Sequence, residues 1–394
     1  MRYVPRALAG TLLQASKHFP ALVLTGPRRA GKTTLLRKLF PKARYVLLED
    51  PDLRARIRND PRAFLEDLRP PVVLDEIQNA PELLAYVRTL IDTGPRRMGQ
   101  WLFTGSQEAA LMRGVTESMA GRAAILHLLP LGLAESNKVN LLNGGFPEVL
   151  ARPQARSLWF ASYLQTYLER DVRAITNVRD LVTFRRFLAL LASRHGQMLN
   201  KSDLAAPLGV SVPTISEWLN ILEATGQIIL VPPYFENLGK RLIKTPKVYI
   251  ADSGMACYLL GVTSAAELER SPFLGPLFEG FVAAEILKSQ ANRGQRKEIY
   301  FFRDQQGLEV DFVVPRPNTG MWLVEAKASK TVRPAMAAPL LSLQRSLAKD
   351  RRRNTRLLVV HRKSRTPYET STLASGVEAS DVERFVKELN RQAK

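Results

Sequence analysis

The chain has 394 residues, 45% of them hydrophobic, and a formal net charge of +20 at pH 7. This length is too great for one ordinary domain, so two or three domains with buried cores are expected. A single cysteine, Cys257, excludes a disulfide framework and favours a cytoplasmic location, and with only four histidines it excludes a zinc site of standard spacing. No apolar run is long enough to cross a membrane, so no membrane partner is expected.

The first motif along the chain is a phosphate-binding loop. Residues 26–33 match the pattern G-x-x-x-x-G-K-[ST] without a mismatch, between a predicted buried strand at 21–25 and a predicted helix at 34–40. This context favours ATP binding, with Lys32 against the β- and γ-phosphates and Thr33 on Mg²⁺. The predicted nucleotide-binding residues are Gly26, Pro27, Arg28, Arg29, Ala30, Gly31, Lys32, Thr33 and Thr34.

Two further strands are expected to complete this site. Residues 71–76 predict a buried parallel strand that ends in two acids. Asp75 would reach Mg²⁺ and Glu76 would orient the attacking water, although acids here could instead cap the next helix. A third strand at 100–103 is followed by Thr104 and Ser106, which are candidates for sensing the γ-phosphate or, alternatively, for forming a turn.

These three strands in this order resemble the AAA-type P-loop ATPases, and more closely a prokaryotic branch with a long C-terminal region. The resemblance runs from about residue 1 to residue 365 and includes Gly121-Arg122 and the stretch 144–148, Gly-Gly-Phe-Pro-Glu. It implies that Arg122 is an arginine finger or a phosphate sensor, with a solvated arginine at a helix end as the alternative. A finger that serves a neighbour's nucleotide would require a homo-oligomer.

The middle of the chain predicts a helix-turn-helix. Residues 199–205 and 212–222 are expected to form two helices joined by a turn at Gly209, with Ser202 capping the first. A strand at 227–231 follows, as in a winged helix. The same arrangement also serves protein contacts in AAA machines, so both DNA and protein are open as partners of this element.

Basic residues indicate where DNA would be bound. The excess of lysine and arginine is largest after residue 330. Phosphate backbones are the expected acidic partner, although a basic surface can serve solubility alone. The predicted DNA contacts are Thr214 on the second helix, Lys240 and Arg241 in the wing, and the run Arg351, Arg352 and Arg353.

The last third of the chain carries a nuclease-like pattern. Asp311 lies in one predicted strand, and Glu325 and Lys327 lie two residues apart in the next, so they project to the same face. This spacing resembles the PD-(D/E)xK nucleases of the restriction-endonuclease-like fold. Val310 stands where that family usually has proline, a position that varies.

A metal site is the functional expectation for this pattern. Asp311 and Glu325 would bind Mg²⁺ with Glu285, or alternatively Glu279, from an amphipathic helix at 278–287, and Lys327 would activate water. A degenerate DNA-binding platform, or a structural ion pair between Asp311 and Lys327, are the alternatives.

We therefore predict an α/β protein with three units. The N-terminal unit (1–140) is a parallel-sheet P-loop AAA-type ATPase domain, the middle unit (141–265) is helical with a winged helix-turn-helix, and the C-terminal unit (266–394) is nuclease-like. The expected function is ATP-driven remodelling or processing of branched or broken duplex DNA, with metal-dependent cleavage as one hypothesis. The alternative is an ATPase switch whose later units serve only as interaction modules.

Overall fold

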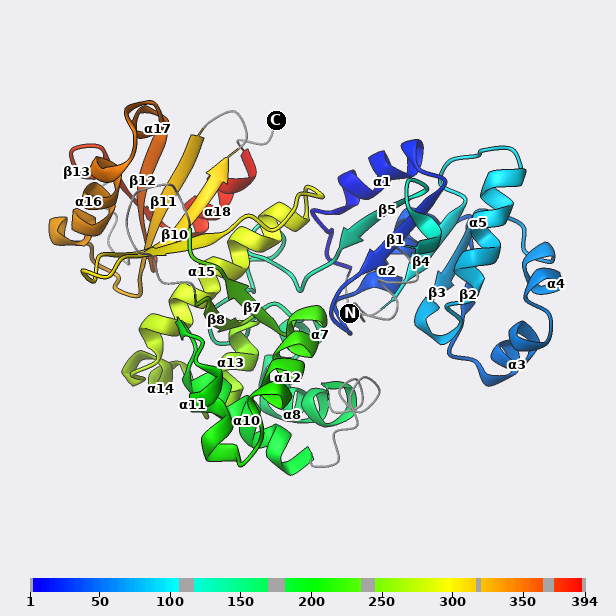
Figure 1. Cartoon of the computed structure of the whole chain (residues 1–394), viewed down its shortest axis with the longest axis horizontal. Coiled ribbons are helices and arrows are strands. Elements are labelled where there is room, and N and C mark those ends of the chain that lie inside the picture. Colours follow the sequence, from blue (N-terminus) through cyan, green and yellow to red (C-terminus); the bar gives the residue numbers. More distant parts are fainter. Residues whose placement is uncertain are drawn as a thin grey trace.

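The computed structural model describes residues 3–105, 117–168, 181–234, 245–316, 320–363 and 372–391. These residues form three β-sheets, one in each unit, together with the helices that pack around them (Figure 1). Ser106, Lys240 and Arg241 lie outside the described ranges. Within those ranges, no helix combines the length and apolar character needed to cross a bilayer.

The N-terminal unit is built around a five-stranded parallel sheet with the order β2-β3-β4-β1-β5. The strands are β1 (Ala21–Thr25), β2 (Arg44–Leu47), β3 (Val72–Asp75), β4 (Trp101–Thr104) and β5 (Ala123–His127). The helices are α1 (Ala9–His18), α2 (Lys32–Leu39), α3 (Pro51–Asn59), α4 (Pro61–Glu66) and α5 (Leu83–Thr93). The three predicted strands are confirmed as β1, β3 and β4, and their carboxyl ends meet at one edge of the sheet.

The middle unit combines helices with a small antiparallel sheet of order β6-β8-β7. Its helices are α7 (Pro147–Ala151), α8 (Arg156–Tyr163), α10 (Leu181–Ser193), α11 (Lys201–Ala205), α12 (Val212–Ala224), α13 (Ser253–Leu259) and α14 (Ala265–Arg270). Its strands are β6 (Gln197–Met198), β7 (Ile228–Val231) and β8 (Lys247–Ile250). Cys257 is buried in the core of this unit.

The turn between α11 and α12 differs from the prediction in one detail. The cap of α11 is Asn200, whose side chain accepts hydrogen bonds from the amides of Ser202 and Asp203, so the assignment of Ser202 as the cap was wrong. An amide oxygen two residues earlier reaches these amides better than a hydroxyl already inside the first turn. Gly209 is left-handed with φ 65°, as the predicted turn requires.

The C-terminal unit contains a six-stranded sheet of order β13-β14-β12-β11-β10-β9. Its strands are β9 (Tyr300–Arg303), β10 (Glu309–Arg316), β11 (Gly320–Lys327), β12 (Thr355–His361), β13 (Thr372–Ala374) and β14 (Val377–Asp381). Its helices are α15 (Leu274–Ala291), α16 (Ala338–Ser346), α17 (Lys349–Arg353) and α18 (Val382–Arg391). Strands β9, β10 and β11 are antiparallel, whereas β11, β12 and β14 run parallel.

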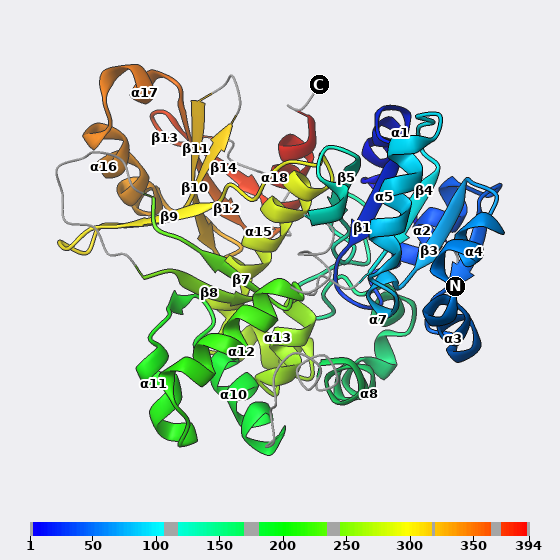
Figure 2. The same ribbon diagram turned by 45° about the vertical axis from the view of Figure 1, so that its right-hand side comes forward.

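Helix α15 touches all three units. In Figures 1 and 2 it extends from the C-terminal unit toward the N-terminal unit. The prediction of an amphipathic helix was wrong, because 12 of its 18 residues are buried. At its C-terminal end, the Thr11 hydroxyl of α1 donates to the Asn292 carbonyl at 2.7 Å, and near its middle Glu285 accepts from the Leu133 amide at 2.9 Å. Glu279 near its start contacts Lys247 of β8.

Candidate functional site

The loop between β1 and α2 has the shape that a phosphate group requires. Gly26 and Gly31 adopt φ values of 140° and 98°, which side chains disfavour. A Cβ on Gly26 would lie 2.1 Å from the carbonyl oxygen of Leu128, so the loop closes only with glycine there. Arg6 holds the loop from outside by donating to the carbonyl of Ala30 at 2.8 Å. The amides of a glycine-rich loop at a helix N-terminus form an anion cradle.

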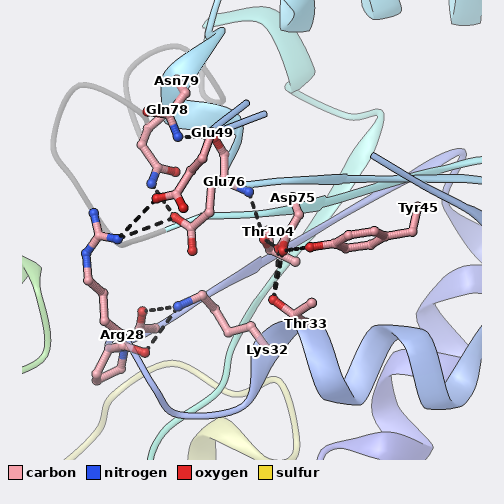
Figure 3. A network of polar contacts seen from close by, with 12 residues as sticks. Arg28, Lys32, Thr33, Tyr45, Glu49, Asp75, Glu76, Gln78, Asn79 and Thr104 are labelled. Carbon is pink, nitrogen blue, oxygen red and sulfur yellow. Dashed lines mark hydrogen bonds and ion pairs between the residues drawn. The ribbon is translucent and has the colours of Figure 1, made fainter. Parts of the chain in front are cut away.

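Lys32 is directed into this loop. It is 5% exposed, and its ammonium donates to the carbonyl oxygens of Gly26 and Pro27 at 2.9 and 3.1 Å (Figure 3). A buried ammonium held by carbonyl dipoles is suited to pair with phosphate oxygens. Helix α2 begins at Lys32, two residues earlier than predicted, because left-handed Gly31 ends the loop. Thr34, in the first turn of α2, is exposed.

Asp75 lies at the centre of a set of hydroxyl groups at the carboxyl end of β3. It is 3% exposed and accepts from Thr33 at 2.9 and 3.0 Å, from Tyr45 of β2 and from Thr104 of β4 (Figure 3). Burial, followed by the hydrogen bond to Asp75, raises the pKa of Tyr45. A carboxylate beside a threonine hydroxyl offers the hard oxygen ligands that Mg²⁺ prefers, so Thr33 and Asp75 fit this ion.

Glu76 is placed for a different role. Its backbone is left-handed with φ 59°, and its amide donates to the Thr104 hydroxyl at 3.1 Å. Its carboxylate accepts from Gln78 and lies 4.0 Å from the guanidinium of Arg28 in the phosphate loop (Figure 3). The turn thus directs the carboxylate of Glu76 toward the loop rather than toward the Asp75 cluster. Thr104 positions both acids, and β4, which carries it, lies between β1 and β3 in the sheet.

Arg122 is not part of this site. It lies immediately before β5 and therefore at the amino end of the sheet, whereas the phosphate loop follows the carboxyl end of β1. Its guanidinium pairs with Asp92 of α5 at 2.6 and 2.8 Å. The prediction that Arg122 senses this chain's own phosphate was wrong, because strand direction places it at the opposite edge.

Replacing Arg122 with alanine should change ATP turnover per chain by less than about twofold, since the residue is remote from the loop. Steady-state rates measured at several protein concentrations will test this. Asp92→Ala, which breaks the same pair from the other side, is the matched control. A tenfold loss in Arg122→Ala with normal rates in Asp92→Ala would place this arginine at a neighbour's nucleotide instead.

The Gly-Gly-Phe-Pro-Glu stretch joins the first two units. A Cβ on Gly145 would lie 2.1 Å from the Leu131 carbonyl oxygen, and the Gly145 amide donates to Asp252 at 2.7 Å. Glu148, in the first turn of α7, pairs with Arg29 of the phosphate loop at 3.4 Å and accepts from Trp159 at 2.8 Å. The stretch therefore connects the phosphate loop to the helices of the middle unit.

A second cluster of charged residues lies in the C-terminal unit. Asp311 of β10 accepts from the amide of Ala326 at 2.9 Å, and Lys327 donates to Glu325 on the same face of β11 at 2.6 Å. The remaining oxygen of Glu325, in a residue only 4% exposed, has no hydrogen-bond partner within the described residues. The predicted acid–acid–lysine set is thus assembled on two neighbouring strands.

The helix contributes Glu279 to this cluster, and the assignment of Glu285 was wrong. Glu285 is 1% exposed and is held by Lys288 at 2.9 Å and by the Leu133 amide. Glu279 instead faces β8, accepting from Lys247 and from the Tyr249 hydroxyl at 2.8 and 2.6 Å. Six residues separate the two glutamates, which at 3.6 residues per turn places them on different faces of α15.

Lys247 of β8 completes the cluster, and sequence reasoning missed it. Its ammonium lies 2.8 Å from Glu279, 2.5 Å from Glu309 and 3.8 Å from Asp311. We call Lys247, Glu279, Glu309, Asp311, Glu325 and Lys327 the carboxylate centre. In the part of the chain that the structure describes, no three acidic, histidine or cysteine side chains converge as ligands for a metal ion. The predicted set of Asp311, Glu325 and Glu285 is not brought together, because Glu285 is held by Lys288 and by the Leu133 amide.

Burial sets the charge of this centre. It raises the pKa of Glu325 to about 8 and that of Glu279 to about 7, and the negative charge of Asp311 contributes to both shifts. Burial likewise raises the pKa of Asp311. For Lys247 burial acts in the opposite direction, but Glu279, Asp311 and Glu309 outweigh it and raise its pKa. Lys247 is thus an ammonium at neutral pH.

The residues predicted to contact DNA differ in how far their side chains are exposed to solvent. The Thr214 hydroxyl lies 2.8 Å from that of Ser211, the cap of α12, and is half-buried. Arg351, Arg352 and Arg353 are exposed on α17, at the opposite end of the molecule from α3 and α4 (Figure 1).

The sequence matches three family models, one for each part of the chain. Residues 18–137 match the model described as an AAA domain. Residues 135–266 and 274–378 match two models, each described as a domain of unknown function, DUF8612 and DUF4143. The match to the AAA domain covers the phosphate loop and the acids of β3, so the N-terminal unit is a P-loop domain of the AAA type.

The chain also has mycobacterial relatives. The uncharacterized proteins Rv2008c of Mycobacterium tuberculosis and Mb2031c of Mycobacterium bovis are each 34% identical to it over 318 residues. The aligned region covers 78% of this chain and 70% of each relative. The chain belongs to the family of these two proteins.

Two archaeal proteins are among the solved structures that match this chain. The Walker-type ATPase PABY2304 of Pyrococcus abyssi is 19% identical, with a TM-score of 0.44 over 64% of this chain and 94% of that one. A signal transduction ATPase with numerous domains, PH0952 of Pyrococcus horikoshii, which has a tetratricopeptide repeat sensor, is 13% identical. Its TM-score is 0.24 over 74% of this chain and 47% of that one.

Proposed function

We propose that this protein hydrolyses ATP in its N-terminal unit and uses the energy to remodel duplex DNA bound by its other two units. The observation that carries the first half is the convergence of Lys32, Thr33, Asp75 and Glu76 at one edge of a parallel sheet. These four groups come from two separate segments of the chain, and each has the chemistry that one part of phosphoryl transfer requires.

Each residue has its own task in this proposal. Lys32 binds the terminal phosphates, and Thr33 and Asp75 hold Mg²⁺, which supplies positive charge to the phosphate oxygens when bound. Glu76 orients the attacking water and accepts its proton. Thr104 keeps both acids in place through its hydroxyl.

DNA binding by the middle unit is supported by its topology. The element order α10-β6-α11-α12-β7-β8, with the sheet order β6-β8-β7, is the order of a winged helix. The connection between β7 and β8 contains Lys240 and Arg241, which we propose as phosphate contacts. The ion pair between Arg29 of the phosphate loop and Glu148 of α7 is the contact through which we propose that nucleotide binding affects the middle unit.

For the C-terminal unit we propose a DNA-binding platform of the restriction-endonuclease-like fold. The order α15-β9-β10-β11-α16-β12, with three antiparallel strands and a parallel fourth, supports that fold. Cleavage at the carboxylate centre is not part of the proposal, because the Lys247 ammonium lies among its acids.

The experiment that tests this function measures ATP hydrolysis with and without single-stranded DNA, linear duplex and a four-way junction, first in Mg²⁺ and then in Mn²⁺. Stimulation by one duplex form is expected, and a gel of the same reactions should show intact DNA. Hydrolysis that no DNA alters would contradict the DNA half of the proposal and favour an ATPase switch with protein partners.

Neutralising α17 should reduce the salt dependence of DNA binding. In the variant with Arg351, Arg352 and Arg353 changed to glutamine, the slope of log K against log salt should become shallower by about 0.9 for each DNA phosphate that α17 neutralises in the wild type. Fluorescence anisotropy of a labelled duplex at several salt concentrations measures this slope.

The matched control removes the same charge elsewhere. Arg58 of α3, Arg62 of α4 and Arg69, which follows α4, are exposed, and changing all three to glutamine should leave the slope unchanged. Equal slopes in the two triple variants would mean that α17 does not contact DNA and that net charge alone sets the affinity.

A further inference from the structure

The carboxylate centre has an ammonium where its acids meet. Lys247 is only 3% exposed, yet three carboxylates from two different elements surround it, Glu279 of α15 and Glu309 and Asp311 of β10. Tyr249, two residues along β8, donates to the same oxygen of Glu279. Such an arrangement is built around one cation, since buried carboxylates without a compensating charge would be strongly destabilising.

The charges of the centre are nearly balanced without a metal ion. Four carboxylates, those of Glu279, Glu309, Asp311 and Glu325, face the ammonium groups of Lys247 and Lys327, and Arg303 also pairs with Glu309 at 3.1 Å. The second oxygen of Glu325 is the one fully buried acceptor of the centre that lacks a hydrogen bond among the described residues. A divalent cation entering here would meet the Lys247 ammonium at close range, and their repulsion is strong in a buried setting.

Lys247 reaches the centre from another unit. It is the first residue of β8 and pairs with Val231 of β7 and Met198 of β6, all in the small sheet of the middle unit. The two acids of β10 belong to the C-terminal unit. The cation of the centre is therefore supplied by the neighbouring unit, and it is present only while β8 lies against β10.

We propose that the Lys247 ammonium takes the place of a divalent cation in the carboxylate centre, so that the intact protein binds no metal ion there, and that removing this ammonium turns the centre into a cation site. The proposal does not depend on ATP hydrolysis or on DNA binding, because it concerns only the occupancy of the centre. It identifies Lys247 as the residue that separates this chain from a metal-dependent phosphodiesterase.

The test measures Mn²⁺ binding to the full chain by calorimetry and by thermal unfolding, without nucleotide or DNA. Wild type and Asp311→Asn should give the same Mn²⁺ isotherm, because Asp311 contacts no metal in the wild type. Lys247→Met should unfold at a lower temperature than the wild type, and Mn²⁺ should raise its unfolding midpoint again. By calorimetry, Lys247→Met should bind Mn²⁺ at least about tenfold more tightly than the wild type does. The double variant Lys247→Met, Asp311→Asn should lose this gain.

Matched variants separate a cation site from general instability. Lys288→Met removes another buried lysine, the partner of Glu285 on the same helix, and should lower stability without any rescue by Mn²⁺. Lys247→Arg keeps the charge and should give the wild-type Mn²⁺ isotherm. Asp311-dependent Mn²⁺ binding by the wild type would overturn the proposal, as would a folded Lys247→Met that gains no binding. The comparison of the wild type with Asp311→Asn shows whether the intact protein binds Mn²⁺ at the carboxylate centre, even if Lys247→Met fails to fold.

Discussion

Replacing Glu76 with glutamine is expected to lower the rate of ATP hydrolysis by a factor of about 10²–10⁴, while ATP binding stays within about twofold of the wild type. Glutamine has the same size as glutamate, and its side-chain oxygen can still accept the hydrogen bond from Gln78. It cannot accept a proton from water, however, and this is the step that the carboxylate beside Arg28 is placed to assist. Single-turnover hydrolysis, with binding of a fluorescent ATP analogue measured in parallel, tests both halves.

Glu49 provides the matched control for this substitution. It is a second carboxylate that lies near Arg28, at 3.9 Å, and it follows β2 instead of β3. Glu49→Gln should leave hydrolysis within about threefold of the wild type, because β2 is the edge strand of the sheet and lies further from the phosphate loop than β3 does. Similar losses in both variants would mean that the charge around Arg28 matters and that Glu76 has no special part in activating water.

Replacing Lys32 with alanine should weaken ATP binding by about 10- to 100-fold and abolish measurable turnover. Charge-assisted hydrogen bonds to the ammonium each contribute about 1.5–3 kcal/mol, which corresponds to this range of affinity. The ammonium points into the loop and is held there by two carbonyl oxygens, so no rearrangement of α2 is needed for it to meet a phosphate. Equilibrium titration with labelled ATP gives the affinity directly.

Lys38 controls for the loss of a lysine from the same helix. It lies near the C-terminal end of α2 and is exposed, so Lys38→Ala should bind ATP with the wild-type affinity. If Lys32→Ala retained the wild-type affinity, the loop would not be a nucleotide site and the proposed function would lose its basis. A circular dichroism spectrum of each variant shows whether the fold is retained.

The nucleotide site could be predicted because its parts are local. Strand, glycine loop and helix follow one another along the chain, and the direction of parallel strands brings Asp75 and Thr104 to the same edge. Tyr45 and Arg6 could not be predicted in the same way, because neither belongs to a motif that marks its contact with Asp75 or Ala30. No pattern in an edge strand such as β2 marks one tyrosine as a partner of a distant carboxylate.

The wrong or missed assignments concern residues whose position depends on how the strands and helices are oriented and packed. Arg122 follows the third predicted strand, but it precedes another strand, so its position at the amino end could have been inferred from the apolar run that comes after it. The choice between Glu285 and Glu279 requires the helix phase, which depends on what α15 packs against. Lys247 gave only a weak signal, a lysine at the start of an otherwise apolar strand, and only tertiary structure brings it to β10.

Helix α15 links the three units through contacts along its whole length. The helix of 18 residues is hydrogen-bonded to the segment after β5 through Glu285 and to β8 through Glu279, and Asn292, the residue that follows it, is hydrogen-bonded to α1. A force or displacement at any of these contacts is transmitted along the helix, since a helix bends far less readily than a loop. Separating the three units at loop boundaries would break these contacts, and a fragment that ends before residue 274 would leave apolar surfaces of the middle unit open to water.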